Sequence, residues 1–354
     1  MTSKGPGATV GNMSSLLVLG GTSWLGGTIV RLALADGHDV ICLARGQSGT
    51  VPDAATLVRA DRAVPGAYAA LPASARWDLV VDLTRQPGQA RSALAALSDR
   101  AEHWALVSSG SVYADHSQIG GDLTTPLLPP FEGDEAPPQR YGEAKAACEA
   151  AVTAYRGANG LDALVARSGL IAGHGDLSDR FGYWVGRFAL AEQDGGPVLV
   201  PENLDRPAQL LDVLDLAAWV LQAGLGGVTG IVDAYGPRRT LSAVLAAASG
   251  VAGFTGETVG VPDGELIASE IEEYMGERSL ALWMHDPQWR GFSARDDASA
   301  VSAGLVARPL DLTTADALTW ERHLGLGRTG RRAGLDRADE LALLGTAGHG
   351  HRPV

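Results

Sequence analysis

Short apolar runs alternate with amphipathic segments along the first half of the chain. Continuous apolar runs are typical of buried parallel strands, whereas apolar residues recurring every three or four positions indicate helices. The runs predict strands at 15–19, 39–44, 57–58, 77–83, 103–108 and 161–166, and the helical spacing predicts helices at 24–35, 91–97 and 141–155. This alternation predicts the α/β class, with a doubly wound parallel sheet.

The pattern becomes less regular after residue 173, and this change predicts the domain boundaries. The sheet domain is expected to span 15–172, with 208–236 returning to it, and 173–207 together with 237–324 would form a smaller C-terminal substrate lobe. Residues 1–14 are predicted to be a flexible leader. The Gly- and Arg-rich segment 325–354 is predicted to be a mobile tail.

Composition narrows the class of protein. The 354 residues are 45% hydrophobic and 19% charged, which excludes a disordered chain. A formal charge of −13 lacks the basic footprint of a nucleic-acid binder, so no nucleic-acid partner is expected. No apolar run approaches about 18 residues, so no membrane span is expected. Two cysteines, Cys42 and Cys148, fit a reducing, cytoplasmic location.

A glycine-rich turn joins the first predicted strand to the first helix. In Gly20-Gly21-Thr22-Ser23-Trp24-Leu25-Gly26, glycines would let the backbone approach a pyrophosphate at the helix N-terminus. The second strand ends at Ala44-Arg45, without the acid that holds the ribose 2′-hydroxyl of NAD. The cation there favours a 2′-phosphate, and therefore NADP(H), with NAD(H) as the alternative.

Two further patterns carry reactive groups. Tyr141 and Lys145 lie four residues apart, on one face of a predicted helix, and an ammonium favours the phenolate form of a neighbouring tyrosine. Ser109 and Ser111 follow the fifth strand, at the sheet edge where α/β proteins bind ligands. Taken singly, such a Tyr–Lys pair is also common on helix surfaces, and such serines are common in turns.

Together, these patterns resemble the extended short-chain dehydrogenase/reductase superfamily, in its NAD-dependent epimerase/dehydratase branch and near actinobacterial reductase-like members. The resemblance covers about residues 16–320 and implies a Rossmann-like fold. It implies catalytic roles for Ser109, Tyr141 and Lys145. The residues expected at the cofactor are Gly20, Thr22, Ser23, Trp24, Leu25, Gly26, Arg45, Asp61, Arg62, Leu83, Tyr141, Lys145, Ser168 and Leu170.

Several positions depart from the family pattern. Ser23 stands where the middle glycine is expected, and it is either a phosphate ligand or a change that loosens cofactor binding. Ser168 replaces the proline expected after Arg167. Gly110-Ser111 replaces the Asp-Glu pair of sugar-nucleotide 4,6-dehydratases, which disfavours dehydration of that type.

The substrate pocket is the least specified part of the prediction. Ser109, Ser111, Arg180, Tyr183 and Trp184 are expected to bind the substrate, with Trp283 and Trp289 as an opposite wall, although core packing is the commoner role for such aromatics. His174 has no second ligand at metal spacing, so no metal is expected.

The predicted function is an NADP(H)-dependent oxidoreductase that interconverts a small carbonyl and an alcohol, with Tyr141 as acid and base. The alternatives are an NAD(P)-dependent sugar-nucleotide epimerase and a non-catalytic nucleotide-sensing or RNA-associated protein. The family resemblance also implies a homodimer.

Overall fold

The computed structural model describes residues 13–347, and its chain divides into two compact units. The first contains the described residues up to Ser108 together with Pro129–Ala166 and Val220–Gly230. The second contains Ser109–Leu128, Arg167–Trp219 and the described residues from Ile231 onwards. Segment 109–128 therefore groups with the second unit, whereas the sequence placed it in the first. Most of the predicted leader lies outside the described residues.

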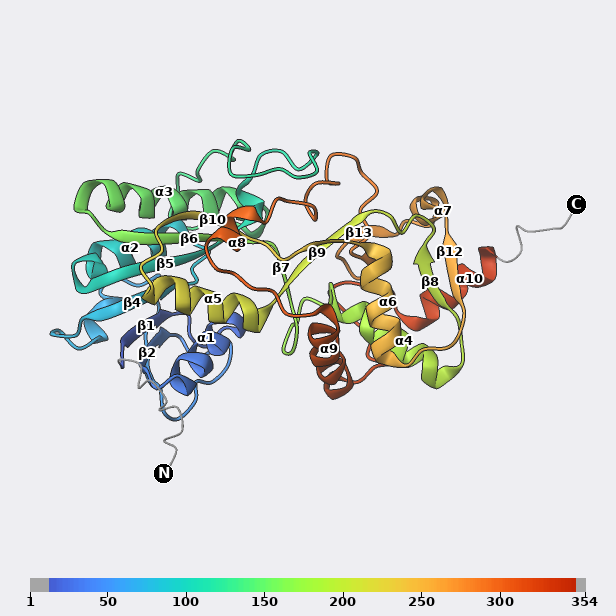
Figure 1. The fold of residues 1–354 in the computed structure, drawn as a ribbon, viewed down its shortest axis with the longest axis horizontal. Coiled ribbons are helices and arrows are strands. Elements are labelled where there is room, and N and C mark those ends of the chain that lie inside the picture. The colour runs from blue at the N-terminus through green and yellow to red at the C-terminus, as the bar shows by residue number, and fades with distance from the viewer. Residues whose placement is uncertain (1–12, 348–354) are drawn as a thin grey trace, which may run out of the picture. The chain divides into compact units, whose positions relative to one another are not determined.

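The largest sheet among these residues has seven strands, in the order β3-β2-β1-β4-β5-β6-β10 (Figure 1). Strand β1 pairs in parallel with β2 and β4, β2 pairs in parallel with β3, and β4 pairs in parallel with β5. The strand order reverses between β1 and β4, which is the switch point where α/β sheets bind ligands. The strands are β1 Ser15–Leu19, β2 Asp39–Ala44, β3 Thr56–Arg59, β4 Trp77–Asp82, β5 Ala101–Ser109, β6 Asp162–Ser168 and β10 Gly230–Ala234.

Helices cover both faces of this sheet, as the doubly wound prediction requires. Helices α2 (Pro87–Leu97) and α3 (Tyr141–Asn159) share one hydrophobic core with β1, β4 and β5, in which Trp77 and Trp104 are buried. Helix α1 (Trp24–Ala35) lies on the opposite face (Figure 1). Helix α5 spans Val213–Leu225. The predicted class and its parallel sheet are confirmed.

The second unit has its own core of aromatic and aliphatic side chains. Helices α4, α6 and α9 pack together around buried Phe181, Trp184 and Trp283. Small sheets complete it: β7 with β9 and β11, β8 with β12, and β13 with β14. Its elements are β7 Leu170–Ala172, α4 Gly182–Asp194, β8 Val198–Pro201, β9 Pro207–Asp212, β11 Arg238–Thr240, α6 Leu241–Ala252, β12 Thr258–Val261, α7 Asp263–Ala268, β13 Glu272–Tyr274, β14 Ser279–Ala281, α8 Ala298–Ser302, α9 Leu310–Leu324 and α10 Arg337–Ala347.

The described part of the predicted tail is packed rather than loose. Ala333 and Leu335 belong to the second unit's core, and α10 places the fully buried Glu340 between Arg187 and Arg337. Buried ion pairs and apolar contacts therefore pack Ala333, Leu335 and Glu340 against the second unit, although composition predicted a mobile tail. Among residues 13–347, no helix is both long and apolar enough to cross a membrane.

Candidate active site

The glycine turn before α1 has the geometry of a phosphate-binding loop. Gly20 adopts φ +100°, a left-handed conformation that favours glycine. A Cβ on Gly26 would lie 2.3 Å from the Gly20 carbonyl oxygen, so only glycine fits there. Leu83 lies against both glycines. These contacts show that the turn packs tightly against the first residues of α1, as the glycines of a dinucleotide-binding turn do.

Ser23 closes this turn with its own hydroxyl. Its Oγ donates to the Gly20 carbonyl at 2.8 Å and accepts from the Gly26 N–H at 3.2 Å, which caps α1. Ser23 therefore donates its one hydroxyl proton to a carbonyl within the turn, and that proton does not point toward a phosphate site. At φ −74° the residue needs no glycine for conformational reasons.

A pair of arginines flanks the end of β2. Arg45 is exposed, directly after Ala44, the buried last residue of that strand. Arg59 ends β3 and pairs in register with Ala44. The Arg59 guanidinium packs against Gly46, where a Cβ would lie 2.2 Å from Nη1. Arg59 was not predicted from the sequence, because only the strand register brings it beside residues 44–46.

Arg62 has a structural role instead of the cofactor role predicted for it. Its guanidinium binds both carboxylate oxygens of Asp82, at 2.8 and 3.0 Å, and also donates to the Tyr68 hydroxyl. Only 7% of the Arg62 side chain is exposed. Because this buried, bidentate ion pair holds the guanidinium against Asp82 at the end of β4, the guanidinium is not free to bind a 2′-phosphate. The carboxylate of Asp61 accepts the Ala63 N–H at 3.0 Å.

Lys145 is a buried ammonium held by main-chain oxygens. Its Nζ donates to the carbonyls of Thr84 and Val107, each at 2.6 Å, near the carboxyl ends of β4 and β5. No carboxylate pairs with it among the described residues, although the side chain is only 3% exposed. An ammonium has three donors, so one remains for a ligand. The charge is thus fixed in place without being neutralised.

Tyr141 precedes Lys145 by one helical turn. It is the first residue of α3 and is half-buried, and its hydroxyl makes no hydrogen bond within residues 13–347. Because positions i and i+4 share a helix face, phenol and ammonium occupy the same side of α3. The arrangement provides a proton-bearing oxygen and a fixed positive charge on one surface, as a carbonyl reduction requires.

Two serine hydroxyls meet where β5 ends, in the second unit. Ser109 Oγ donates to Ser111 Oγ at 3.2 Å and accepts the Ser111 N–H at the same distance. Both residues are half-buried. Ser168 and Leu170, also predicted at the cofactor, are buried on either side of the junction between β6 and β7.

The second unit also buries a polar cluster that was not predicted from the sequence. The Tyr113 hydroxyl donates to Asp233 at 2.6 Å and accepts from Arg167 at 2.9 Å. The Arg295 guanidinium lies 3.4 Å from the centre of the Tyr113 ring and pairs with Asp233 at 3.3 Å. Burial is the main cause that raises the pKa of Tyr113 well above its usual range. This phenol therefore stays protonated and is structural.

Two of the predicted substrate-binding aromatics are core residues. Tyr183 and Trp184 lie on α4 and have no exposed surface, and the Trp184 indole donates to the Ala281 carbonyl at 2.7 Å. Their helical position beside Phe181 could not reveal which face of α4 was buried. Arg180 is half-buried and lies over the Tyr274 ring. Trp283 is fully buried, whereas Trp289 is 44% exposed and stacks on His116.

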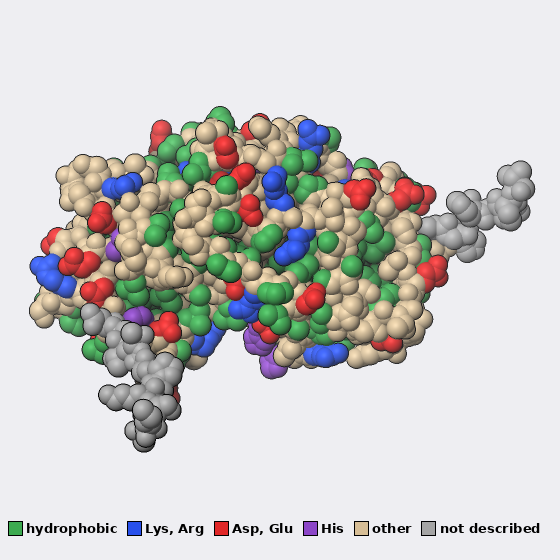
Figure 2. All heavy atoms as spheres, in the orientation of Figure 1, with side chains coloured by type: hydrophobic (Ala, Val, Ile, Leu, Met, Phe, Trp, Pro, Cys, Tyr) green, Lys and Arg blue, Asp and Glu red, His purple; other side chains and the backbone are tan. Residues whose placement is uncertain are grey.

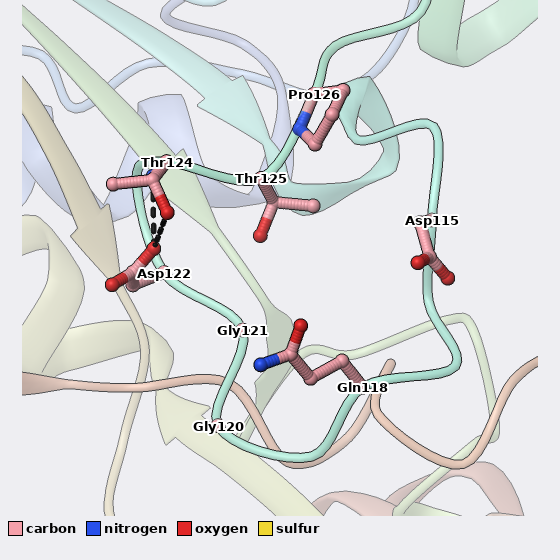
Figure 3. Close-up of a pocket in the computed structure, with 8 residues that line it drawn as sticks. All are labelled: Asp115, Gln118, Gly120, Gly121, Asp122, Thr124, Thr125 and Pro126. Carbon is pink, nitrogen blue, oxygen red and sulfur yellow. Dashed lines mark hydrogen bonds between the residues drawn. The ribbon is translucent and has the colours of Figure 1, made fainter.

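A polar pocket lies in the loop after Tyr113 (Figure 3). Asp115, Gln118, Asp122 and Thr124 line it, and Asp122 accepts hydrogen bonds from its neighbour Thr124. In the described part of the chain, no group of His, Cys, Asp and Glu side chains is arranged to hold a metal ion. On the face drawn in Figure 2, basic side chains are scattered among acidic ones rather than gathered into one patch.

Comparison with known proteins identifies the family. The profile of the NAD-dependent epimerase/dehydratase family matches residues 16–226, more than half of the chain. 2'-Dehydrokanamycin reductase from Streptomyces kanamyceticus is 34% identical over 158 residues, which span 44% of this chain and 42% of that protein.

Solved structures share the fold at low sequence identity. An epimerase-like protein from Burkholderia cenocepacia has a TM-score of 0.66 at 23% identity, covering 88% of this chain and 98% of its own. UDP-glucose 4-epimerase from Thermus thermophilus, solved with NAD, has a TM-score of 0.61 at 18% identity, covering 87% and 99%. The chain belongs to the NAD-dependent epimerase/dehydratase family.

Proposed function

We propose that this protein is an NADP(H)-dependent reductase that converts a ketone of a small, oxygen-rich molecule into an alcohol, or catalyses the reverse reaction. The observation that carries the proposal is the buried Lys145 ammonium, which has no carboxylate partner in the described chain and lies one helical turn from Tyr141. The reductase direction is supported by the relative whose name identifies a dehydro form of kanamycin as the compound it reduces.

In this mechanism, Tyr141 gives its hydroxyl proton to the oxygen of the substrate carbonyl. Lys145 favours the negative charge that Tyr141 then carries, because a fixed cation stabilises a nearby anion. Ser109 orients the reacting oxygen by a hydrogen bond, as the family resemblance implies. When bound, the nicotinamide cofactor supplies or accepts the hydride. In the oxidation direction the same groups remove the proton from the alcohol.

The cofactor fits the residues that are present. The tight turn from Gly20 to Gly26, at the N-terminus of α1, is suited to the pyrophosphate because its glycines let the backbone approach the phosphates. Arg45 and Arg59 supply two cations beside β2, where NAD-binding proteins carry an acid. Neither guanidinium has a hydrogen-bonded partner within residues 13–347. We therefore propose NADP(H) as the preferred cofactor, with a 2′-phosphate bound between these arginines.

The remaining proposals concern assembly and location. A homodimer is proposed from the family resemblance, and light scattering of the purified protein measures it. A cytoplasmic location is supported by Cys42 and Cys148, which are buried free thiols.

A screen of ketones with NADPH and NADH tests this function. The purified protein should oxidise NADPH in the presence of at least one hydroxylated ketone, 2′-dehydrokanamycin included, with a lower KM for NADPH than for NADH. Release of NADP⁺ into solution after each turnover is expected. A protein that purifies with tightly held NAD(H), and that exchanges no cofactor while inverting a sugar nucleotide, is an epimerase and contradicts the proposal.

A further inference from the structure

Tyr235 lies where three strands of the sheet end. It follows β10 directly, and its ring lies against Gly169, where a Cβ would be 2.5 Å from a ring carbon. Its hydroxyl reaches Gly110, just after β5, where a Cβ would be 1.5 Å from the oxygen. The phenol therefore fits only because positions 110 and 169 are glycines. Ligands of α/β sheets bind at this carboxyl edge of the strands.

The Tyr235 hydroxyl has no hydrogen-bond partner among residues 13–347, although the residue is only 3% exposed. Its oxygen is not one of the fully enclosed unpaired atoms of this part of the chain, so the hydroxyl reaches the surface, where a ligand can accept its hydrogen bond. Tyr113, in the same unit, shows the ordinary case, with its hydroxyl bound to Asp233 and Arg167. Burial is also the main cause that raises the pKa of Tyr235 above its usual range, so the hydroxyl keeps its proton and can donate it.

The neighbours of this hydroxyl point to its ligand. Gly110 lies between Ser109 and Ser111, whose hydroxyls are hydrogen-bonded to each other. Ser109 is the residue proposed to hold the reacting oxygen. A donor set beside that serine is suited to a second oxygen, on a carbon close to the reacting one. Sugar-ring ketones and other α-hydroxy ketones carry their oxygens in this way.

We propose that Tyr235 is a substrate-binding residue, whose hydroxyl donates a hydrogen bond to an oxygen adjacent to the ketone that is reduced. The inference rests on the proposed function and names its substrate class as α-hydroxy ketones. A site built to bind a substrate hydroxyl discriminates against the analogue that lacks it, because its buried polar group is then left unpaired.

The test compares two ketones that differ in one hydroxyl. Wild-type protein should reduce 2-hydroxycyclohexanone with a higher kcat/KM than cyclohexanone. Tyr235→Phe should lower kcat/KM for 2-hydroxycyclohexanone about five- to tenfold, as expected for one hydrogen bond, and should leave cyclohexanone unchanged. The loss should appear chiefly in KM, because the variant retains Tyr141, Lys145 and Ser109.

Stability measurements separate a binding role from a structural one. Tyr235→Phe keeps the ring and its glycine contacts and removes only a hydroxyl without a hydrogen-bond partner in the described chain. The Tm of the free protein should therefore not fall, and the Kd for NADPH should not rise. Tyr113→Phe is the matched control. It loses two buried hydrogen bonds and should lower Tm while leaving the ratio of the two kcat/KM values unchanged.

Each outcome decides between the claims. An unchanged ratio of the two kcat/KM values in Tyr235→Phe overturns the inference alone, whether or not Tm falls. So does a wild-type protein that reduces other ketones of the screen but does not prefer the hydroxylated ketone of this pair. If none of the ketones in the screen supports oxidation of NADPH by the wild-type protein, the proposed function and this inference are overturned together.

Discussion

Two buried cations, Lys145 in the first unit and Arg295 in the second, are held in opposite ways. In the first, Lys145 donates to two main-chain carbonyls and has no carboxylate partner in the described chain. In the second, Arg295 pairs with Asp233 and lies on the ring of Tyr113. Carbonyl oxygens fix an ammonium without cancelling its charge, whereas a carboxylate cancels most of it. The difference indicates that the first arrangement keeps a charge available for chemistry and the second holds the fold together.

Removing the phenol hydroxyl beside Lys145 should have the largest effect. Tyr141→Phe is expected to lower kcat by about 10²–10⁴-fold, because the proton donor is lost. Fluorescence titration should give an unchanged Kd for NADPH, and Tm should be unchanged because this hydroxyl has no partner in the described residues. Tyr155→Phe, farther along the same helix α3, is the control and should retain full activity. Full activity of Tyr141→Phe would remove Tyr141 from the mechanism.

Replacing the ammonium should affect both activity and stability. Lys145→Met leaves the Thr84 and Val107 carbonyls without their donor, so Tm should fall. We expect kcat/KM to fall about 100-fold, the lower end of a proton-transfer contribution. Lys145→Arg retains a cation and should restore part of the activity. If Lys145→Met lowers Tm but leaves kcat/KM intact, the ammonium is structural and the contrast with Arg295 disappears.

The arginine pair beside β2 should act on cofactor choice alone. Arg45→Ala and Arg59→Ala should each raise the KM for NADPH about tenfold, since each removes a charge-assisted contact with the 2′-phosphate. The KM for NADH, which lacks that phosphate, should not change. Arg31→Ala, on α1, is a matched control that removes an arginine from the same unit. Equal effects on both cofactors would contradict a 2′-phosphate site.

Removing the Tyr113 hydroxyl from its buried cluster should lower the stability of the protein without changing its activity. Tyr113→Phe removes hydrogen bonds to Asp233 and Arg167 and should cost about 1–3 kcal/mol, seen as a Tm lower by several degrees. The kcat of the protein that remains folded should be close to wild type. A large loss of kcat without a change in Tm would show that this cluster, and not only α3, takes part in the reaction.

Local sequence signals predicted the sheet and the helix α3 that carries Tyr141 and Lys145. Apolar runs identify buried parallel strands directly, and a spacing of four residues places Tyr141 and Lys145 on one face whatever the rest of the fold does. The position of Tyr235 after β10 was a usable signal that the sequence analysis did not take up, because carboxyl ends of strands are where ligands bind.

Other features depend on partners far away in the sequence. Arg62 was predicted to bind the cofactor, but it forms an ion pair with Asp82, which lies 20 residues later in the sequence. The Gly- and Arg-rich segment 325–354 was predicted to be a mobile tail, yet Arg331 pairs with the buried Glu321 of α9. Tyr183 and Trp184 belong to a helix whose buried face is set by α6 and α9. None of these pairings leaves a local pattern in the sequence.

Hydride transfer itself is the most direct test of the central claim. Wild-type protein is incubated with NADPH deuterated at the transferred C4 position and with the best ketone from the screen, and the products are analysed by mass spectrometry. The account predicts one deuterium on the new carbinol carbon and one free NADP⁺ for each alcohol formed. Deuterium that stays on protein-bound cofactor, or NADPH that binds without reacting with any ketone, would contradict it.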